Sequence, residues 1–228
     1  MEHAPELEEV ESLQYSSVTE FHGSLTSSHK LLNRFAENVS WSQKCNFINI
    51  PTDCPQRDER CGWTGDIAAF APTAAFNMDI TQFMKKWLGD LAIVQKEVGV
   101  VPWICPSNNF IYDRTSTFWA EIYDQCDALW GDAATLVPWA VYQSSGDVSV
   151  LEQQYESMKS WVNTEKRLAD IVEEDSPRYI WKHGMQLGDW LAPGKDMHGW
   201  TASAKWTSTA YFANSCLLYT SPSPRDIS

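Results

Sequence analysis

Apolar residues recur at the three- and four-residue spacing of an amphipathic helix in several stretches of the chain. The clearest stretch covers about residues 80–98, where Asp79 can cap the start and Gly99 can end the helix. The first stretch begins beside the candidate caps Ser27 and Ser28. The others cover about residues 132–143, about residues 148–168, and a segment that begins near Thr201. The pattern therefore predicts a mainly helical protein.

The segment before these helices has a different pattern. Residues 13–21 are rich in β-branched, aromatic and hydroxyl side chains, which is typical of strands. Because one or two strands bury little surface alone, we expect residues 1–26 to be trailing strands of an upstream β domain. Long segments at 43–65, 98–125 and 173–200 separate the predicted helices and hold many of the tryptophans. Helices joined by such long loops favour an α/α barrel with its site on one rim over a simple bundle.

Composition narrows the possible partners. The 228 residues include 30 acidic and 17 basic side chains, a formal net charge of −13, which argues against nucleic acid and anionic membranes as partners. No stretch has the roughly 18 apolar residues of a transmembrane helix, and the acidic residues 1–9 do not resemble a signal peptide. The sequence assigns neither a cellular compartment nor an oligomeric state. The six cysteines show no C-x-x-C pair, so we expect free thiols.

The densest group of polar residues is the run DCPQRDERCGWTGD at residues 53–66. It contains the carboxylates Asp53, Asp58, Glu59 and Asp66 and the guanidinium groups of Arg57 and Arg60. An arginine between acids keeps some of them ionised, whereas a carboxyl shielded by Trp63 can stay protonated and donate a proton. Glycoside hydrolysis needs this division of roles between carboxyl groups. The alternative interpretation of this run is a salt-bridged surface loop.

The 12 tryptophans provide a second signal. Trp87 and Trp161 lie on apolar helix stripes and are expected in the core. Two further groups of acid, tryptophan and glycine surround Trp130, at residues 127–133, and Trp190, at residues 188–194. An indole face complements the C–H face of a pyranose ring, so loop tryptophans near acids are typical of sugar sites. The alternative is that they pack the loops against the helices.

The sequence shows no motif for metal binding, for nucleotide cofactors or for catalysis by a serine or cysteine nucleophile. His183 and His198 have no helical metal-ligand spacing, so we expect no metal. The chain has no P-loop, no G-x-G-x-x-G and no G-x-S-x-G, so we expect no cofactor. Cys54 and Cys61 have no histidine nearby in the sequence to activate them as nucleophiles.

The run at 53–66, followed by FAPTA at 70–74 and FNMD at 76–79, closely resembles the signature of bacterial α-L-rhamnosidases, glycoside hydrolase family 78. The similarity continues through KWLGDL at 86–91, LWGDA at 129–133 and GDWLAPG at 188–194, and it covers roughly residues 12–216. The resemblance implies an (α/α)6 barrel that hydrolyses terminal α-L-rhamnosides with inversion and without metal. The ligand would then be an L-rhamnose-containing glycoside or polysaccharide.

The resemblance also implies roles for individual residues. Glu59 matches the general acid of the family. Asp53 and Asp66 match aspartates that bind rhamnose hydroxyls, and the binding shell is completed by Arg57 and Trp63. Trp130 and Trp190 match positions expected to line the sugar pocket. Asp58 is interpreted as a support for Arg57 or Arg60 and not as a catalyst.

The sequence departs from the family pattern in two ways. The family places its general base far downstream, beyond the residues present here, so we expect residues 27–216 to be the N-terminal half of the barrel. Residues 217–228 do not continue the pattern and resemble a translated adapter sequence, so we expect them to be non-native. We therefore expect this chain to be part of an inverting α-L-rhamnosidase. By itself, without the general base, we expect it to be inactive. The alternatives are a non-catalytic carbohydrate-binding remnant, or another α/α-barrel glycosidase or lyase.

Overall fold

The computed structural model describes residues 10–106, 127–171, 178–182, 186–188, 190, 193–194 and 204–220. The helices in this part of the chain are α1 (Lys30–Asn46), α2 (Thr64–Asn77), α3 (Thr81–Val98), α5 (Ala133–Ser145), α6 (Val148–Ala169) and α7 (Ala204–Thr220). None of them is long and apolar enough to span a membrane. The prediction of a mainly helical protein is confirmed.

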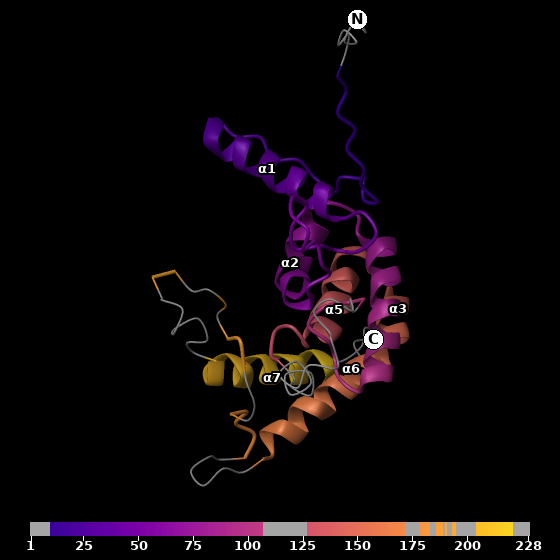
Figure 1. The fold of residues 1–228 in the computed structure, drawn as a ribbon, viewed down its shortest axis with the longest axis vertical. Coiled ribbons are helices and arrows are strands. Elements are labelled where there is room, and N and C mark those ends of the chain that lie inside the picture. Colours follow the sequence, from indigo (N-terminus) through magenta and orange to yellow (C-terminus); the bar gives the residue numbers. More distant parts are fainter. Residues whose placement is uncertain are drawn as a thin grey trace, which may run out of the picture.

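Helix α5 is at the centre of the packing and contacts α2, α3, α6 and α7 (Figure 1). The core that these helices share contains the indoles of Trp87 on α3 and Trp161 on α6, both fully buried as predicted. Trp161 packs directly on Gly131, where an added Cβ would lie 2.0 Å from the indole. Only glycine therefore fits at the start of α5 while this indole faces it.

The predicted stop and start signals can now be compared with the observed helix ends. Gly99 ends α3 with a φ of 91°, a left-handed conformation that glycine adopts without strain. Asp79 accepts a hydrogen bond from the Thr81 backbone N–H at 2.9 Å, although Ile80 occupies the cap position itself. At α1 the prediction of a serine cap is wrong. His29 is the cap, and its ring nitrogen accepts from the Leu32 N–H.

Helix α2 begins within the last two residues of the predicted loop 43–65 and continues to Asn77, over residues for which no helix was predicted. Its sequence, TGDIAAFAPTAAFN, is apolar on all sides and includes Pro72, so it has no amphipathic period. Its small side chains, including Ala71 and Ala74, are buried against neighbouring elements. Close packing of small residues, which periodicity does not detect, explains why this helix was missed.

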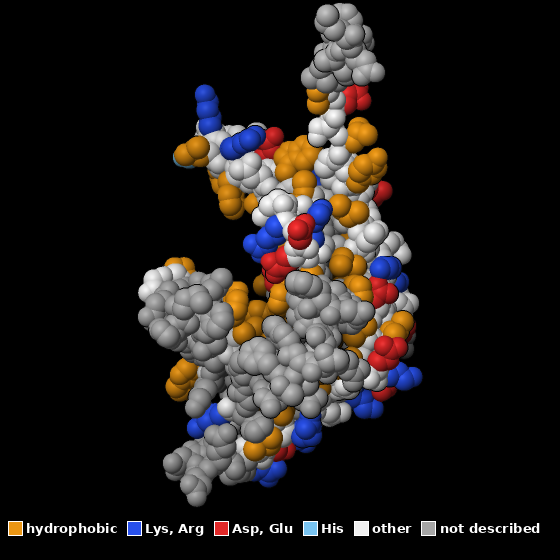
Figure 2. All heavy atoms as spheres, viewed as in Figure 1, with side chains coloured by type: hydrophobic (Ala, Val, Ile, Leu, Met, Phe, Trp, Pro, Cys, Tyr) orange, Lys and Arg blue, Asp and Glu red, His pale blue; other side chains and the backbone are white. Residues whose placement is uncertain are grey.

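Helix α1 projects away from the other helices (Figure 1). Its apolar stripe was expected to face a core, yet Leu31, Leu32 and Phe35 are 75%, 43% and 64% exposed. Figure 2 shows hydrophobic side chains on the surface of this projecting helix. Among the described residues, the C-terminal end of α1 is bonded to the other helices, for example through the Gln43 side chain, which donates to the Ala74 carbonyl at 3.1 Å.

Residues 10–26 run beside the C-terminal end of α1 (Figure 1). Their only β pairing within the described residues is an isolated bridge between Phe21 and Met78. The prediction of trailing strands in this segment is therefore not confirmed. At the other end of the chain, α7 continues past Leu217, where the expected non-native segment begins, to Thr220.

Candidate active site

The loop between α1 and α2, residues 47–63, is fixed to the segment 101–105. The Cys105 N–H donates to the Gly62 carbonyl at 2.9 Å, and the Thr64 N–H donates to the Trp103 carbonyl at 2.8 Å. The two segments approach so closely that a Cβ on Gly62 would lie 2.2 Å from the Cys105 oxygen. The polar run at 53–66 is therefore held by a defined backbone.

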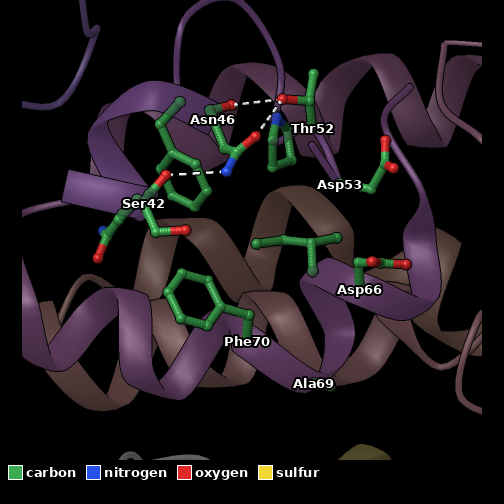
Figure 3. A pocket seen from close by; sticks show the side chains of 11 residues that line it. Ser42, Asn46, Thr52, Asp53, Asp66, Ala69 and Phe70 are labelled. Atoms are coloured by element: carbon green, nitrogen blue, oxygen red, sulfur yellow. Dashed lines mark hydrogen bonds between the residues drawn. The ribbon is translucent and has the colours of Figure 1, made fainter. Parts of the chain in front are cut away.

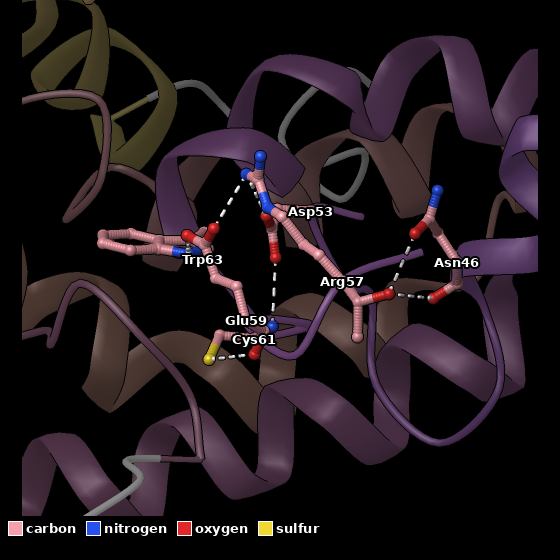
Figure 4. A network of polar contacts seen from close by, with 7 residues as sticks. Asn46, Asp53, Arg57, Glu59, Cys61 and Trp63 are labelled. Atoms are coloured by element: carbon pink, nitrogen blue, oxygen red, sulfur yellow. Dashed lines mark hydrogen bonds and ion pairs between the residues drawn. The ribbon is translucent and has the colours of Figure 1, made fainter. Parts of the chain in front are cut away.

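Within this loop, four of the predicted site residues form one network of polar contacts (Figure 4). The Arg57 Nη2 atom lies 2.7 Å from Glu59 Oε2 and 3.4 Å from Asp53 Oδ2. The Trp63 indole N–H donates to Glu59 Oε1 at 3.0 Å, and Asp53 Oδ1 accepts from the Cys61 N–H at 3.0 Å. Both oxygens of Glu59 are thus held by donors, and the carboxyl has a defined position.

Asp66 lies in the first turn of α2 and opens to solvent. Protein atoms around its carboxyl, together with the negative charges of Asp53 and Glu59, raise the pKa of Asp66 to about 6. Asp66 therefore changes its charge close to neutral pH. The guanidinium of Arg57 faces the Cys54 thiol and Glu59, and these neighbours raise its pKa further above the ordinary value.

Three groups in this network have the spacing of a metal site. The ligand atoms of Asp53, Cys54 and Glu59 lie within 4.8 Å of one another. The Arg57 guanidinium forms ion pairs with both carboxylates, so a cationic side chain already balances their charge. The expectation of a site without metal stays a prediction.

The other residues singled out in the sequence differ in their environments. Asp58 is exposed, and the ion pairs of Arg57 in the described part of the chain are with Asp53 and Glu59 instead. Trp130 is buried and packs against Gly65, where an added Cβ would lie 2.5 Å from the indole. Trp190 is 42% exposed, and its role as a wall of the sugar pocket stays a prediction.

A pocket of about 370 Å³ adjoins the network, between the C-terminal end of α1 and α2 (Figure 3). This volume is within the range of roughly 300–1,000 Å³ that is usual for small-molecule sites. Asp53 and Asp66 line one end of it, as Figure 3 shows. Phe70 lines the other part. The sequence analysis did not identify Phe70 as a site residue, because it did not identify the helix that places Phe70 one turn after Asp66.

A second group of acids is buried under the N-terminal end of α5, and we call Asp127, Asp132 and Glu165 the buried acid group. Burial raises the pKa of Asp127 to about 8, even though both its oxygens accept from the Leu187 N–H. Asp132 accepts from the Leu129 N–H at 2.7 Å and from the Ser215 hydroxyl, yet its complete burial still raises its pKa. Burial also raises the pKa of Glu165 well above its ordinary value, with Asp132 as the next cause.

These contacts give the buried acid group a structural role. Asp127 joins the start of the α5 region to residues 186–188, and Asp132 joins α5 to α7 through Ser215. The sequence placed Asp132 in the group of acid, tryptophan and glycine at residues 127–133 and did not predict its contact with Ser215, because that contact joins positions far apart in the chain.

Comparison with known proteins decides the family. The model of the bacterial alpha-L-rhamnosidase six-hairpin glycosidase domain matches residues 20–221 of this chain. The chain belongs to this family. The resemblance noted on the motif at 53–66 is thereby confirmed.

Relatives and solved structures within the rhamnosidase family agree. Alpha-L-rhamnosidases of Formosa agariphila and Streptomyces avermitilis are each 36% identical, over 90% and 82% of this chain. Those alignments cover 20% and 16% of the relatives, so the chain spans about a fifth of their length.

Among solved structures, the Streptomyces avermitilis alpha-L-rhamnosidase complexed with L-rhamnose matches with a TM-score of 0.72 and 33% identity. The match covers 90% of this chain and 17% of that one. The alpha-L-rhamnosidase of Dictyoglumus thermophilum matches with a TM-score of 0.73 and 35% identity, over 90% of this chain and 21% of that one. The rhamnosidase fold assignment therefore rests on sequence and on structure together.

Proposed function

We propose that this chain is the part of an inverting α-L-rhamnosidase that carries the general acid, Glu59. The observation that supports this most directly is the network in which Arg57 and Trp63 hold both Glu59 oxygens beside a pocket lined by Asp53 and Asp66. A relative of known structure, 33% identical, is complexed with L-rhamnose. Its ligand suggests the same sugar for this pocket.

The proposed mechanism begins with binding of a terminal rhamnose. Asp53 and Asp66 accept hydrogen bonds from sugar hydroxyls, and the ion pair with Arg57 holds Asp53 in place. Trp63, Trp130 and Trp190 contribute apolar walls around the ring. Glu59, in its protonated form, then donates its proton to the glycosidic oxygen as the bond to the anomeric carbon breaks.

Inversion requires a second carboxylate that activates a water on the opposite face of the sugar, about 6.5–9.5 Å from the acid. We propose that this general base is supplied by a part of the protein outside these 228 residues, within the second half of an (α/α)6 barrel. Residues 27–216 would form the first half, residues 1–26 the end of an upstream β domain, and residues 217–228 a non-native segment. The chain covers about a fifth of its relatives, which leaves room for the general base elsewhere in such a protein.

The test compares the 228-residue chain with the protein expressed from its complete gene. Each is mixed with 4-nitrophenyl α-L-rhamnoside, and the released sugar is followed by proton NMR. We expect β-L-rhamnose as the first product of the complete protein and no turnover by the chain alone. Release of α-L-rhamnose first would contradict inversion, and turnover by the chain alone would contradict the missing base. Rhamnose binding without hydrolysis in the complete protein would favour a carbohydrate-binding remnant.

A further inference from the structure

A second pocket, of about 510 Å³, is bordered by the C-terminal end of α1, the loop 47–63, helix α3 and Pro106. Two of its lining residues, Arg60 and Lys86, are cationic, and none of its described lining residues is acidic. We call it the cationic pocket. The chain as a whole has a formal net charge of −13, so a pocket with this lining departs from the general charge of the protein. Such a local positive potential favours an anionic ligand.

Arg60 differs in its contacts from Arg57, the other arginine of the motif at 53–66. Within the part of the chain that the structure describes, Arg60 forms no ion pair or side-chain hydrogen bond, whereas Arg57 pairs with two carboxylates. The backbone of Arg60 has a φ of 31°, an uncommon conformation for a residue with a Cβ. The next residue, Cys61, donates its N–H to Asp53 Oδ1 at 3.0 Å and accepts from the Asp53 N–H at 3.1 Å, which fixes the backbone there. Uncommon backbone conformations that the surrounding structure fixes are frequent at binding sites.

Lys86 keeps donors available to a ligand. Its Nζ atom lies 2.6 Å from Asp90 Oδ2, one turn further along α3. Because an ammonium has three N–H donors, this contact leaves two of them for other acceptors. The Lys86 side chain is 57% exposed, and an exposed ion pair is a weak competitor for a ligand that binds in the pocket. Arginine and lysine together offer the donors that carboxylate, sulfate and phosphate groups accept from.

The remaining lining is largely apolar and is held by a closed turn. Ile48, Ile50 and Pro55 give the cationic pocket an apolar wall. The Thr52 N–H donates to the Asn46 carbonyl at 3.1 Å, and the Thr52 hydroxyl donates to Asn46 Oδ1 at 3.0 Å, so the turn that carries both isoleucines is fixed. A preformed wall lowers the cost of ordering when a ligand binds. A ligand with a carbon skeleton beside its negative charge therefore fits this pocket better than a bare ion.

We propose that the cationic pocket binds an organic acid, such as a sugar that carries a carboxylate, through charge-assisted hydrogen bonds from Arg60 and Lys86. The carbon skeleton of the ligand lies against the apolar wall. The inference goes beyond the proposed function and does not depend on it. None of the residues proposed to bind rhamnose or to donate the proton lines this pocket.

The experiment is a calorimetric titration of the complete protein at low ionic strength. The probes are methyl β-D-glucuronide, methyl β-D-glucoside and sodium sulfate. The two glycosides differ only in the group at C6, a carboxylate in the first and a neutral hydroxymethyl group in the second. We expect the glucuronide to bind at least about tenfold more tightly than the glucoside, because only its carboxylate accepts charge-assisted hydrogen bonds. Equal binding of the two glycosides, no binding of the glucuronide, or binding of sulfate alone would overturn the inference.

Variants locate the binding in the cationic pocket. Arg60→Gln and Lys86→Gln should each raise the dissociation constant of the glucuronide about tenfold, because each removes a charged donor. Two separate variants keep the test decisive if one of them fails to fold. The matched control is Lys96→Gln, which removes the same charge from an exposed position on the same helix, outside the pocket, and should leave the dissociation constant unchanged. Equal weakening in Lys96→Gln would show a general attraction of anions and would contradict a site.

Competition separates this pocket from the candidate active site. Saturating L-rhamnose should leave the dissociation constant of the glucuronide unchanged, because the two ligands contact different residues. Displacement of the glucuronide by L-rhamnose would place the acid beside Glu59 and would overturn the inference, while leaving the proposed function intact.

Discussion

Two groups of acids in this protein have similar side chains and opposite environments. In the loop 53–66, Asp53 and Glu59 share the guanidinium of Arg57, and Glu59 also accepts from the Trp63 indole. In the buried acid group, backbone N–H groups and a hydroxyl hold Asp127 and Asp132 instead, and burial raises the pKa of all three members. The carboxyls of the run 53–66 line or adjoin a pocket that a substrate can enter, whereas the buried acid group lies inside the protein and joins parts of the fold.

A raised pKa alone does not identify a functional carboxyl in this protein. The largest upward shifts are found in the buried acid group, where Glu165 is completely buried. Neither oxygen of Glu165 has a hydrogen-bond partner of good geometry within the described residues. Its shift follows from the loss of water, which also excludes a substrate from contact with it. Access to a pocket, which Asp53 and Asp66 have, therefore separates the candidate site from the structural group.

The largest expected effect is the loss of activity when the proposed general acid, Glu59, is replaced. Glu59→Gln in the complete protein should lower kcat on an aryl α-L-rhamnoside by about 10²–10⁴-fold, because the amide cannot donate the acidic proton. The dissociation constant for L-rhamnose should change little. Steady-state kinetics and calorimetric titration measure the two quantities.

The matched control is Glu37→Gln on α1. Glu37 also pairs with an arginine, Arg34, at 2.9 Å, but both side chains are more than half exposed. This variant should keep full activity, because an exposed pair contributes little. Equal activity of Glu59→Gln and Glu37→Gln would remove Glu59 from the role of acid.

The next effect concerns the pH dependence of stability. The pKa of Asp127 is about 8 in the folded protein and about 4 in an unfolded chain. Between these values the folded state keeps a proton that the unfolded state releases, so stability must fall as pH rises. The free energy of unfolding should fall by roughly 1 kcal/mol per pH unit for this group. Urea unfolding between about pH 5 and pH 8 measures the slope.

Asp127→Asn should reduce this slope, because asparagine has no proton to release. Asp79→Asn is the control. Hydrogen bonds from Thr81 lower the pKa of Asp79, so it is ionised in both states throughout this range and its removal should leave the slope unchanged. A slope that persists in Asp127→Asn and disappears in Asp79→Asn would show that the two environments have been assigned the wrong way round.

A smaller effect is expected from Glu165→Met, which replaces a buried acid by an apolar side chain of similar length. Asp132 keeps its bonds to Leu129 and Ser215 in this variant. We expect stabilisation of about 1 kcal/mol at pH 7, increasing with pH, because burial disfavours the ionised form of the carboxyl that is removed. Glu156→Met, at an exposed position 3.9 Å from Lys159, should change stability by less than about 0.5 kcal/mol. A loss of stability in Glu165→Met at pH 8 would contradict this account.

The smallest effect is in substrate binding. The pKa of Asp66 is about 6, so the carboxyl becomes ionised between about pH 5 and pH 7. An ionised carboxylate accepts hydrogen bonds more strongly, and KM for an aryl α-L-rhamnoside should fall several-fold over this range. The fall should be absent in Asp66→Asn and present in Asp58→Asn, whose side chain is exposed in the same motif. A rise of KM over this range would contradict the role of Asp66 as an acceptor.

The sequence predicted α3 and α6 because they carry apolar stripes, and it predicted α5, which has no such stripe, together with its end at Gly146. It did not predict α2, whose apolar residues surround the helix. The core of the site was recognisable because Asp53, Glu59 and Asp66 lie in one short run. The sequence did not predict the position of Phe70 in the pocket or the hydrogen bond between Asp132 and Ser215. Both depend on contacts between elements far apart in the chain, which local sequence patterns do not show.

The contact between Gly131 and Trp161 restricts the order in which this sequence can change during evolution. Any side chain at position 131 collides with the indole, whereas a smaller residue at position 161 leaves only a cavity. A lineage can therefore lose the tryptophan first and then replace the glycine, but the reverse order passes through an intermediate that does not pack. The contact therefore couples the two positions, although 29 residues lie between them.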